Sequence, residues 1–140
     1  MSARFFLDTN IFVYSFDPAA PAKAKRATEL IRQAIATRKG VVSYQVVQEF
    51  FNVALRRFIP AMTTTEAEQY LSTAFRPLLA VHSSQALYGE ALRLQWKHKL
   101  SWYDSLIVSS AVEAECGILY SEDLQAGQRF GELLVKNPFV

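Results

Sequence analysis

Short apolar segments alternate with amphipathic segments along the whole chain, and this alternation restricts the fold more than any other feature. Runs short enough for buried strands occupy residues 5–7, 41–42, 78–81, 118–120 and 133–135. Segments with apolar residues at spacings of three and four, typical of helices, occupy residues 22–39, 44–58, 63–75, 83–99 and 101–116. This order predicts an α/β fold with a mostly parallel sheet of four to five strands and helices on both faces.

Capping residues mark several of the expected helix boundaries. Gly40 is expected to end the helix of residues 22–39 as its C′ residue. Thr63–Thr65 can cap the helix expected at residues 63–75, with Glu66 in its first turn. Gly117 is expected to end the most apolar helix, directly before the fourth strand.

Composition narrows the class of protein. The 140 residues predict one domain, and the hydrophobic share of 51% and charged share of 20% are typical of soluble globular proteins. No run approaches the roughly 18 apolar residues of a membrane span, and residues 1–4 lead directly into the first strand, which argues against a signal peptide. Cys116, the only cysteine, excludes an internal disulfide and a multi-thiolate zinc site. We expect it to be a buried, inert thiol of a cytoplasmic protein.

A carboxylate stands where the first apolar run ends. Asp8 follows Phe5–Leu7, a run without alternation that suits a strand covered on both faces. In open parallel sheets, ligands bind in the crevice at the carboxyl ends of the strands, so Asp8 is expected to project there with Asn10 one turn away. The alternative is that Asp8 or Asn10 simply caps the helix that begins near Ile11.

Three further acidic positions are candidates for the same crevice. Glu49 lies on a polar stripe, shared with Gln45, Gln48 and Asn52, of an otherwise apolar helix. Asp104 lies in the first turn of the most apolar helix, and Glu122 and Asp123 follow the fourth strand. Each has a simpler interpretation: a solvated helical residue, a helix cap with Ser101, and a turn. Spacing does not decide whether Glu122 or Asp123 points inward.

Carboxylates brought to one edge of a sheet repel each other unless a cation lies between them. The four expected to meet are Asp8, Glu49, Asp104 and Asp123. Oxygen-only ligands favour hard divalent ions, so this set predicts a site for Mg²⁺ or Mn²⁺ that would suit phosphodiester hydrolysis. No histidine lies next to a candidate serine, so the sequence does not indicate a covalent nucleophile.

The order of these stretches resembles that of a known family. The matching stretches are Phe6–Asn10, Gln48–Phe50, Trp102–Ile107 and Leu119–Leu124. Through them, the chain resembles the PIN-domain ribonucleases, and most of all the VapC-type toxins of bacterial toxin–antitoxin pairs. The resemblance covers the whole chain and implies a single PIN domain over residues 1–140, folded as a PIN-like three-layer sandwich.

The resemblance also implies roles for individual residues. The acids Asp8, Glu49, Asp104 and Asp123 would form the catalytic, metal-binding quartet. Asn10 would be the polar residue beside the first Asp, and Ser121 would orient the acids by hydrogen bonding. The family pattern favours Asp123 over Glu122, although Glu122 departs from the commoner Asn or Arg and could add to the site. No core acid is missing.

The substrate implied by the resemblance is RNA, cut by hydrolysis with Mg²⁺ or Mn²⁺. Toxins of this type are homodimers held inactive by a small antitoxin. Aromatic residues could form an apolar groove for an antitoxin helix, although core packing is the favoured interpretation for most of them. They are Phe12, Tyr14, Phe16, Phe50, Phe51 and Phe58.

Basic residues suggest where RNA would bind. Lys97–Lys99 precede Asp104 closely and could hold phosphates, but they also complement a helix C-terminus, and that interpretation is slightly favoured. Lys23, Lys25 and Arg26 form a second candidate patch. The net charge of +2 permits nucleic-acid binding without arguing for it.

Two other functions compete with the nuclease hypothesis. Haloacid-dehalogenase-type phosphatases also begin with an Asp after a first strand and would use Asp8 as nucleophile. They need a second Asp where Asn10 stands, and a cap region for which 140 residues leave little room. A non-catalytic PIN-fold binding module would bind a partner tightly and hydrolyse no RNA, but the complete set of acids argues against it.

Overall fold

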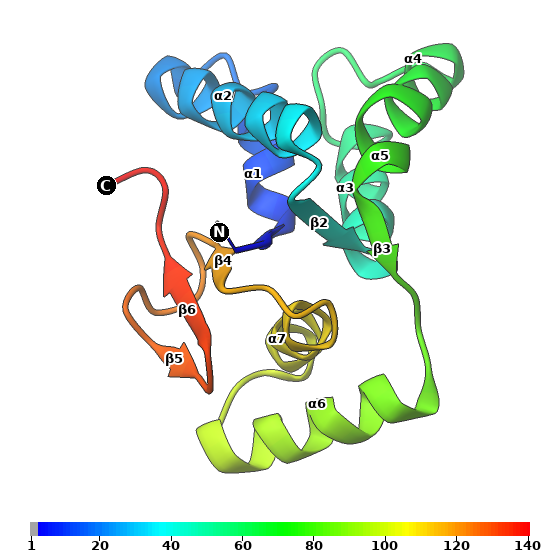
Figure 1. The fold of residues 1–140 in the computed structure, drawn as a ribbon. Coiled ribbons are helices and arrows are strands. Elements are labelled where there is room, and N and C mark those ends of the chain that lie inside the picture. The colour runs from blue at the N-terminus through cyan, green and yellow to red at the C-terminus, as the bar shows by residue number, and fades with distance from the viewer. Residues whose placement is uncertain (1–2) are drawn as a thin grey trace.

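A six-stranded, mostly parallel sheet forms the centre of the computed structural model, which describes residues 3–140 (Figure 1). The strands are β1 (Phe5–Leu7), β2 (Gly40–Ser43), β3 (Leu79–Val81), β4 (Ile118–Tyr120), β5 (Arg129–Phe130) and β6 (Leu133–Lys136). Their order is β3-β2-β1-β4-β6-β5, and all neighbours are parallel except β5 and β6. The expected α/β class and parallel sheet are confirmed.

Helices cover both faces of this sheet. They are α1 (Thr9–Tyr14), α2 (Pro21–Thr37), α3 (Tyr44–Ala54), α4 (Thr64–Tyr70), a π-helical turn η1 (Leu71–Phe75), α5 (Arg76–Leu78), α6 (Gln85–His98) and α7 (Trp102–Glu113). Figure 1 shows α1 and α2 above the strands and α6 and α7 below them. The three-layer arrangement is therefore the expected one. Among residues 3–140, no helix has both the length and the apolar character needed to cross a membrane.

One strand was not expected from the sequence. β5 has only two residues and pairs antiparallel with β6, through Arg129 opposite Leu134 and Phe130 opposite Leu133. The turn between them uses Gly131 at φ 62°, a conformation that favours glycine. A two-residue strand leaves no periodic pattern, so the sheet has six strands instead of the four to five predicted.

The core lies on both sides of the central strands. Phe6 and Leu7 in β1 and Leu119 in β4 have no exposed surface, as expected for strands covered on both faces. Above the sheet, Phe12 of α1 and Phe50 of α3 are also fully buried. The core-packing interpretation of the aromatic run is correct for these two residues, while Phe16 is 42% exposed.

Some helix boundaries differ from the prediction. α2 ends at Thr37, and Arg38 adopts the left-handed conformation at φ 59°. Gly40 is not the C′ residue; it begins β2, where a Cβ atom would lie only 2.2 Å from the Cβ of Ala34. The glycine is needed for this close approach of strand and helix.

Two helices end earlier than predicted, and one predicted helix cap is present. α3 ends at Ala54, four residues before the predicted end, and α7 ends at Glu113 rather than next to Gly117. The capping box of Thr63 and Glu66 is present, as predicted.

Cys116 is buried after the end of α7, and burial raises the pKa of its thiol to about 11. The thiol is therefore protonated near neutral pH, as expected for an inert residue.

Candidate active site

A cavity of about 450 Å³ opens at the carboxyl ends of β1, β2 and β4. It is lined by Asp8, Thr9, Asn10, Val13, Tyr14, Gln45, Glu49, Val53, Tyr103, Asp104, Ile107, Glu122 and Asp123. All four predicted acids and Asn10 belong to this lining, although they come from four distant segments of the chain. Ser121 is fully buried and contacts the site from behind.

Asp8 is the most deeply placed of these acids, with 5% of its surface exposed. It follows β1 and is the N-cap of α1: its Oδ1 accepts a hydrogen bond from the Thr9 amide at 2.7 Å. Its Oδ2 accepts a hydrogen bond from the Ser121 hydroxyl, also at 2.7 Å. Capping the helix and facing the crevice were posed as alternatives, and this carboxylate does both.

Burial raises the pKa of Asp8 to about 7. Desolvation of the carboxylate is the largest cause, and hydrogen bonds from Ser121 and Thr9 act in the opposite direction. The negative charges of Asp123 and Glu49 raise the pKa further. This carboxylate therefore lies in surroundings that favour either a proton or a neutralising cation.

The pKa of Asp8 predicts how stability depends on pH when no divalent ion is present. The pKa is near 3.8 in the unfolded chain and about 7 in the folded protein, so the folded state binds the proton more tightly. The resulting stabilisation is complete below the lower value and is lost as the pH rises through the higher one. From pH 4 to 7, we expect wild type to lose about 2 to 4 kcal/mol relative to the Asp8→Asn variant. Chemical denaturation with a chelator at several pH values measures the difference, and parallel pH profiles would contradict the prediction.

Glu49 reaches the cavity from α3. The Thr9 hydroxyl donates to its Oε1 at 2.6 Å, and Gln45, one turn earlier, has its Nε2 atom 3.4 Å from the other oxygen. The polar stripe predicted on this helix is therefore divided: Gln45 and Glu49 face the cavity, while Gln48 and Asn52 are exposed. Thr9 and Gln45 were not identified from the sequence, although Gln45 lay on the predicted stripe.

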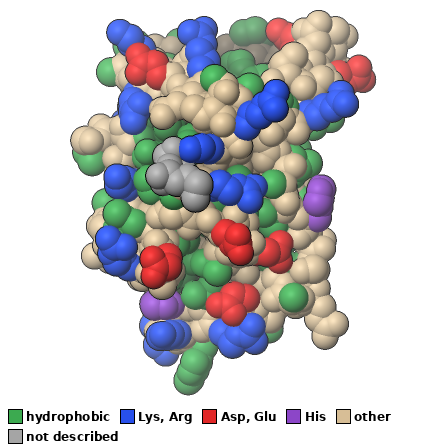
Figure 2. Space-filling view, in the orientation of Figure 1, with side chains coloured by type: hydrophobic (Ala, Val, Ile, Leu, Met, Phe, Trp, Pro, Cys, Tyr) green, Lys and Arg blue, Asp and Glu red, His purple; other side chains and the backbone are tan. Residues whose placement is uncertain are grey.

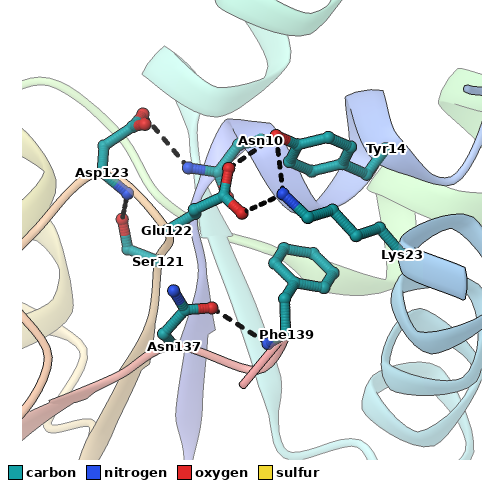
Figure 3. Close-up of polar contacts among 8 residues, drawn as sticks. All are labelled: Asn10, Tyr14, Lys23, Ser121, Glu122, Asp123, Asn137 and Phe139. Atoms are coloured by element: carbon teal, nitrogen blue, oxygen red, sulfur yellow. Dashed lines mark hydrogen bonds and ion pairs between the residues drawn. The ribbon is translucent and has the colours of Figure 1, made fainter. Parts of the chain in front are cut away.

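Asp104 and Asp123 complete the acidic lining from the other side. The Asp104 amide donates to the Ser101 hydroxyl at 3.2 Å, so the capping interpretation is correct while the carboxylate still lines the cavity. The carboxylate of Asp123 accepts a hydrogen bond from the Asn10 amide group at 3.1 Å (Figure 3). The Ser121 hydroxyl also accepts from the Asp123 backbone amide at 3.2 Å, which connects this residue to Asp8.

Both Glu122 and Asp123 line the cavity, which answers the question that spacing left open. Glu122 forms an ion pair with Lys23, at 2.6 Å, and accepts a hydrogen bond from the Tyr14 hydroxyl. These donors lower the pKa of Glu122. The sequence had suggested Lys23 only as part of a basic patch and Tyr14 only as a groove residue.

The carboxylates share a cavity but do not already form one ligand group. Within residues 3–140, no three acidic, histidine or cysteine side chains are arranged to hold a metal ion together. Of the four predicted acids, three accept hydrogen bonds from protein donors: Asp8, Glu49 and Asp123. The four predicted acids thus line one cavity, but their side chains as placed do not form a single ligand group.

Two further oxygen atoms in the cavity would suit a hard cation as ligands. The Oδ1 of Asn10 and the Oε1 of Gln45 are buried without a hydrogen-bond partner, and both residues line the cavity. Buried oxygens without a donor are costly, and a cation or its bound water would satisfy them. The lining therefore offers oxygen ligands alone, as Mg²⁺ or Mn²⁺ prefers.

The basic segment Lys97–Lys99 does not belong to this cavity lining. Lys97 and His98 form the last turn of α6, and Lys99 is its left-handed C-cap. The ring of His98 packs edge-on against Phe130, with centroids 4.8 Å apart. This placement at the end of α6 agrees with the helix C-terminus interpretation of the segment.

Three solved structures have similar folds over nearly their whole length. A toxin–antitoxin complex from Klebsiella pneumoniae has a TM-score of 0.65 and 18% identity, with 95% of this chain and 96% of that chain covered. VapC20 of Mycobacterium tuberculosis, described as a toxin that cleaves the sarcin–ricin loop, has a TM-score of 0.61 and 18% identity, with 85% and 89% covered. FitAcB of Neisseria gonorrhoeae has a TM-score of 0.63 and 17% identity, with 96% and 98% covered. At these identities, the likeness establishes the fold alone.

Sequence comparison identifies the family directly. A comparison with curated proteins gives no significant match. The model of the PIN domain matches residues 5–129. Because this match spans most of the 140 residues, the chain belongs to the PIN domain family.

Proposed function

We propose that this protein is a divalent-metal-dependent endoribonuclease and the toxin of a type II toxin–antitoxin pair. The observation that carries the proposal is the convergence of Asp8, Glu49, Asp104 and Asp123 on one cavity. Membership of the PIN family supports it, as do structural neighbours described as a toxin–antitoxin complex and a toxin that cleaves the sarcin–ricin loop.

These four acids would hold Mg²⁺ or Mn²⁺ at the carboxyl edge of the sheet. When bound, such an ion polarises a scissile phosphate and lowers the pKa of a water molecule. The other polar residues of the site position the acids: Ser121 and Thr9 hold Asp8, Thr9 also holds Glu49, and Asn10 holds Asp123. Such supporting hydrogen bonds fix the orientation of metal-binding carboxylates.

RNA would reach the ion across the rim of the cavity. Tyr103 lines the cavity and is 64% exposed, so its ring is available to stack on a base. The face shown in Figure 2 carries basic and acidic side chains intermixed, with no single basic stripe. On that face, the described residues therefore offer no broad cationic track of the kind used by general nucleic-acid binders.

The family match argues against one of the two rival functions and leaves the other open to test. The phosphatase hypothesis is set aside, because the chain matches the PIN domain model and carries Asn10 where that chemistry needs a second Asp. A non-catalytic PIN module remains the alternative that experiment must distinguish. It predicts binding of an antitoxin-like protein partner without hydrolysis of RNA.

Incubation of purified protein with total RNA tests the proposed activity. We expect cleavage in Mg²⁺ or Mn²⁺, loss of cleavage when a chelator is added, and recovery when the ion is returned in excess. Heat-treated protein and buffer alone control for contaminating nucleases. Cleavage that persists in chelator would overturn the metal dependence, and intact RNA under every condition would favour the non-catalytic module.

We also propose that the protein folds as a single PIN domain that pairs as a homodimer. One continuous hydrophobic core supports the first part. On α6, Tyr88, Leu92 and Trp96 recur every fourth residue and are 38%, 59% and 75% exposed, which is unusual for large apolar side chains on a free surface.

A substitution on this helix tests the pairing. We expect Leu92→Arg to shift the sedimentation coefficient from that of a dimer to that of a monomer, because it places a charge in the proposed apolar contact. Leu71→Arg, at a residue 43% exposed on η1, is the matched control and should leave the dimer intact. A monomeric wild-type protein, or a dimer in both variants, would contradict pairing through α6.

A further inference from the structure

Glu122 uses both of its carboxylate oxygens in contacts with two helices (Figure 3). Its Oε1 accepts a hydrogen bond from the Tyr14 hydroxyl of α1 at 2.5 Å. Its Oε2 lies 2.6 Å from the ammonium nitrogen of Lys23, at the start of α2. Glu122 therefore connects the segment after β4 to α1 and α2.

The Lys23 cation is itself held in place by aromatic rings. It lies 4.6 Å from the centre of the Tyr14 ring and 5.6 Å from that of Phe139, and it contacts the Tyr14 oxygen at 3.3 Å. The rings of Tyr14 and Phe139 pack edge-on with centroids 5.1 Å apart. This position is favourable for an ammonium group and restricts the geometry of its pair with Glu122.

The C-terminal residues 137–139 contact the cluster of Lys23, Tyr14 and Glu122. The backbone amide of Phe139 donates to the side chain of Asn137 at 2.9 Å, and Arg26 of α2 donates to the Pro138 carbonyl at 3.2 Å. In Figure 3 the Phe139 ring lies beside Lys23 and Tyr14. The pair of Lys23 and Glu122 is therefore part of a built cluster, unlike an isolated surface ion pair.

Glu122 lies between two residues of the candidate site. Ser121 donates to Asp8 and accepts from the backbone amides of Asp123 and Leu124, at 3.2 and 3.3 Å. Asp123 is exposed, with its carboxylate directed to Asn10. A shift of the segment at Glu122 would therefore move Asp123 and disturb the hydrogen bond that Ser121 makes with Asp8.

We propose that Glu122 is a positioning residue rather than a metal ligand, and that Tyr14 and Lys23 hold it so that Asp123 and Ser121 face the ion site. This inference rests on the proposed function, whose acids it positions. The competing assignment makes Glu122 a fifth ligand. The two differ in what happens when Tyr14 or Lys23 is changed. Loss of a positioning contact weakens ion binding, whereas release of a ligand from its internal partners leaves ion binding unchanged or strengthens it.

The test compares Mn²⁺ binding by calorimetry for wild type, Lys23→Met, Lys23→Arg and Tyr14→Phe. We expect Lys23→Met and Tyr14→Phe each to weaken Mn²⁺ binding by about tenfold, and Lys23→Arg to stay near wild type. Arg93→Met is the matched control, because it breaks the exposed ion pair with Glu90 on α6 and should have no effect. Affinity that is unchanged or higher in both Lys23→Met and Tyr14→Phe would overturn the proposal.

A second readout needs no ion. Hydrogen exchange at the amides of Asp123 and Leu124 should be faster in Lys23→Met than in wild type, and unchanged in Arg93→Met. Equal exchange in Lys23→Met and wild type would also overturn the positioning role. Failure of the proposed function has a different signature: wild type would then leave RNA intact, whatever the differences between variants in Mn²⁺ affinity and exchange.

Discussion

We expect Asp8→Asn to lower the rate of RNA cleavage by about a thousandfold or more, which corresponds to about 4 kcal/mol of transition-state stabilisation. The amide has the same shape as the carboxylate but lacks the negative charge that would bind the ion. The fold should remain intact, because asparagine caps helices as well as aspartate: its Oδ1 can accept from the Thr9 amide, and its Nδ2 can donate to the Ser121 hydroxyl oxygen. Single-turnover cleavage in Mg²⁺, with circular dichroism of the same samples, measures both quantities.

Asp17 offers a matched control for this substitution. It lies after α1, outside the lining of the acidic cavity, and its carboxylate accepts a hydrogen bond from the Ala19 amide at 2.9 Å. Asp17→Asn should therefore cleave at the wild-type rate. If Asp8→Asn cleaves as fast as this control, the assignment of the site is wrong.

We expect Phe50→Ala to reduce the free energy of unfolding by about 3 to 5 kcal/mol. The Phe50 ring is fully buried, and its centroid lies 5.1 Å from Tyr70, 5.3 Å from Phe75 and 5.8 Å from Phe16. The substitution leaves a cavity between α3 and the helices that it packs against. Urea denaturation at neutral pH measures the loss.

Substitution of Glu49, the neighbour of Phe50 on α3, should affect activity instead of stability. Glu49 faces the acidic cavity, so we expect Glu49→Gln to cause little change in stability and a large loss of RNA cleavage.

The control for the truncation in Phe50→Ala is Leu55→Ala. Leu55 is 45% exposed and follows the end of α3, so its truncation should cost less than about 1 kcal/mol. A loss for Phe50→Ala no greater than that for Leu55→Ala would show that α3 is not anchored through this ring.

Local patterns predicted most of the elements and the acids of the cavity. The strands β1 and β4 were found because unbroken apolar runs indicate burial on both faces. Asp8 was placed at this cavity because it follows β1, and parallel strands end at a shared edge. The same argument placed Glu122 and Asp123 after β4, and only the family resemblance favoured Asp123 of the two. Glu49 was found from the spacing of polar residues on an apolar helix, although only Gln45 and Glu49 of that stripe face the cavity.

Contacts between distant segments could not be predicted from such patterns. The role of Gly40 depends on its approach to Ala34, which no local signal records. Glu122 meets Tyr14 and Lys23 across 108 and 99 residues of chain, so composition and periodicity do not identify the three as a group. The two-residue strand β5 and the π-helical turn η1 depend in the same way on tertiary packing rather than on propensity.

Diffraction from a crystal grown with Mn²⁺, recorded for anomalous scattering, tests most directly whether acids from four segments form one ion site. We predict an anomalous peak in the acidic cavity within about 2.0 to 2.4 Å of oxygens from Asp8 and at least one other acid of the set. A peak that contacts Glu122 in place of Asp123 would contradict the assigned ligands. A cavity without any manganese, in protein that still cleaves RNA, would contradict the metal-dependent mechanism itself.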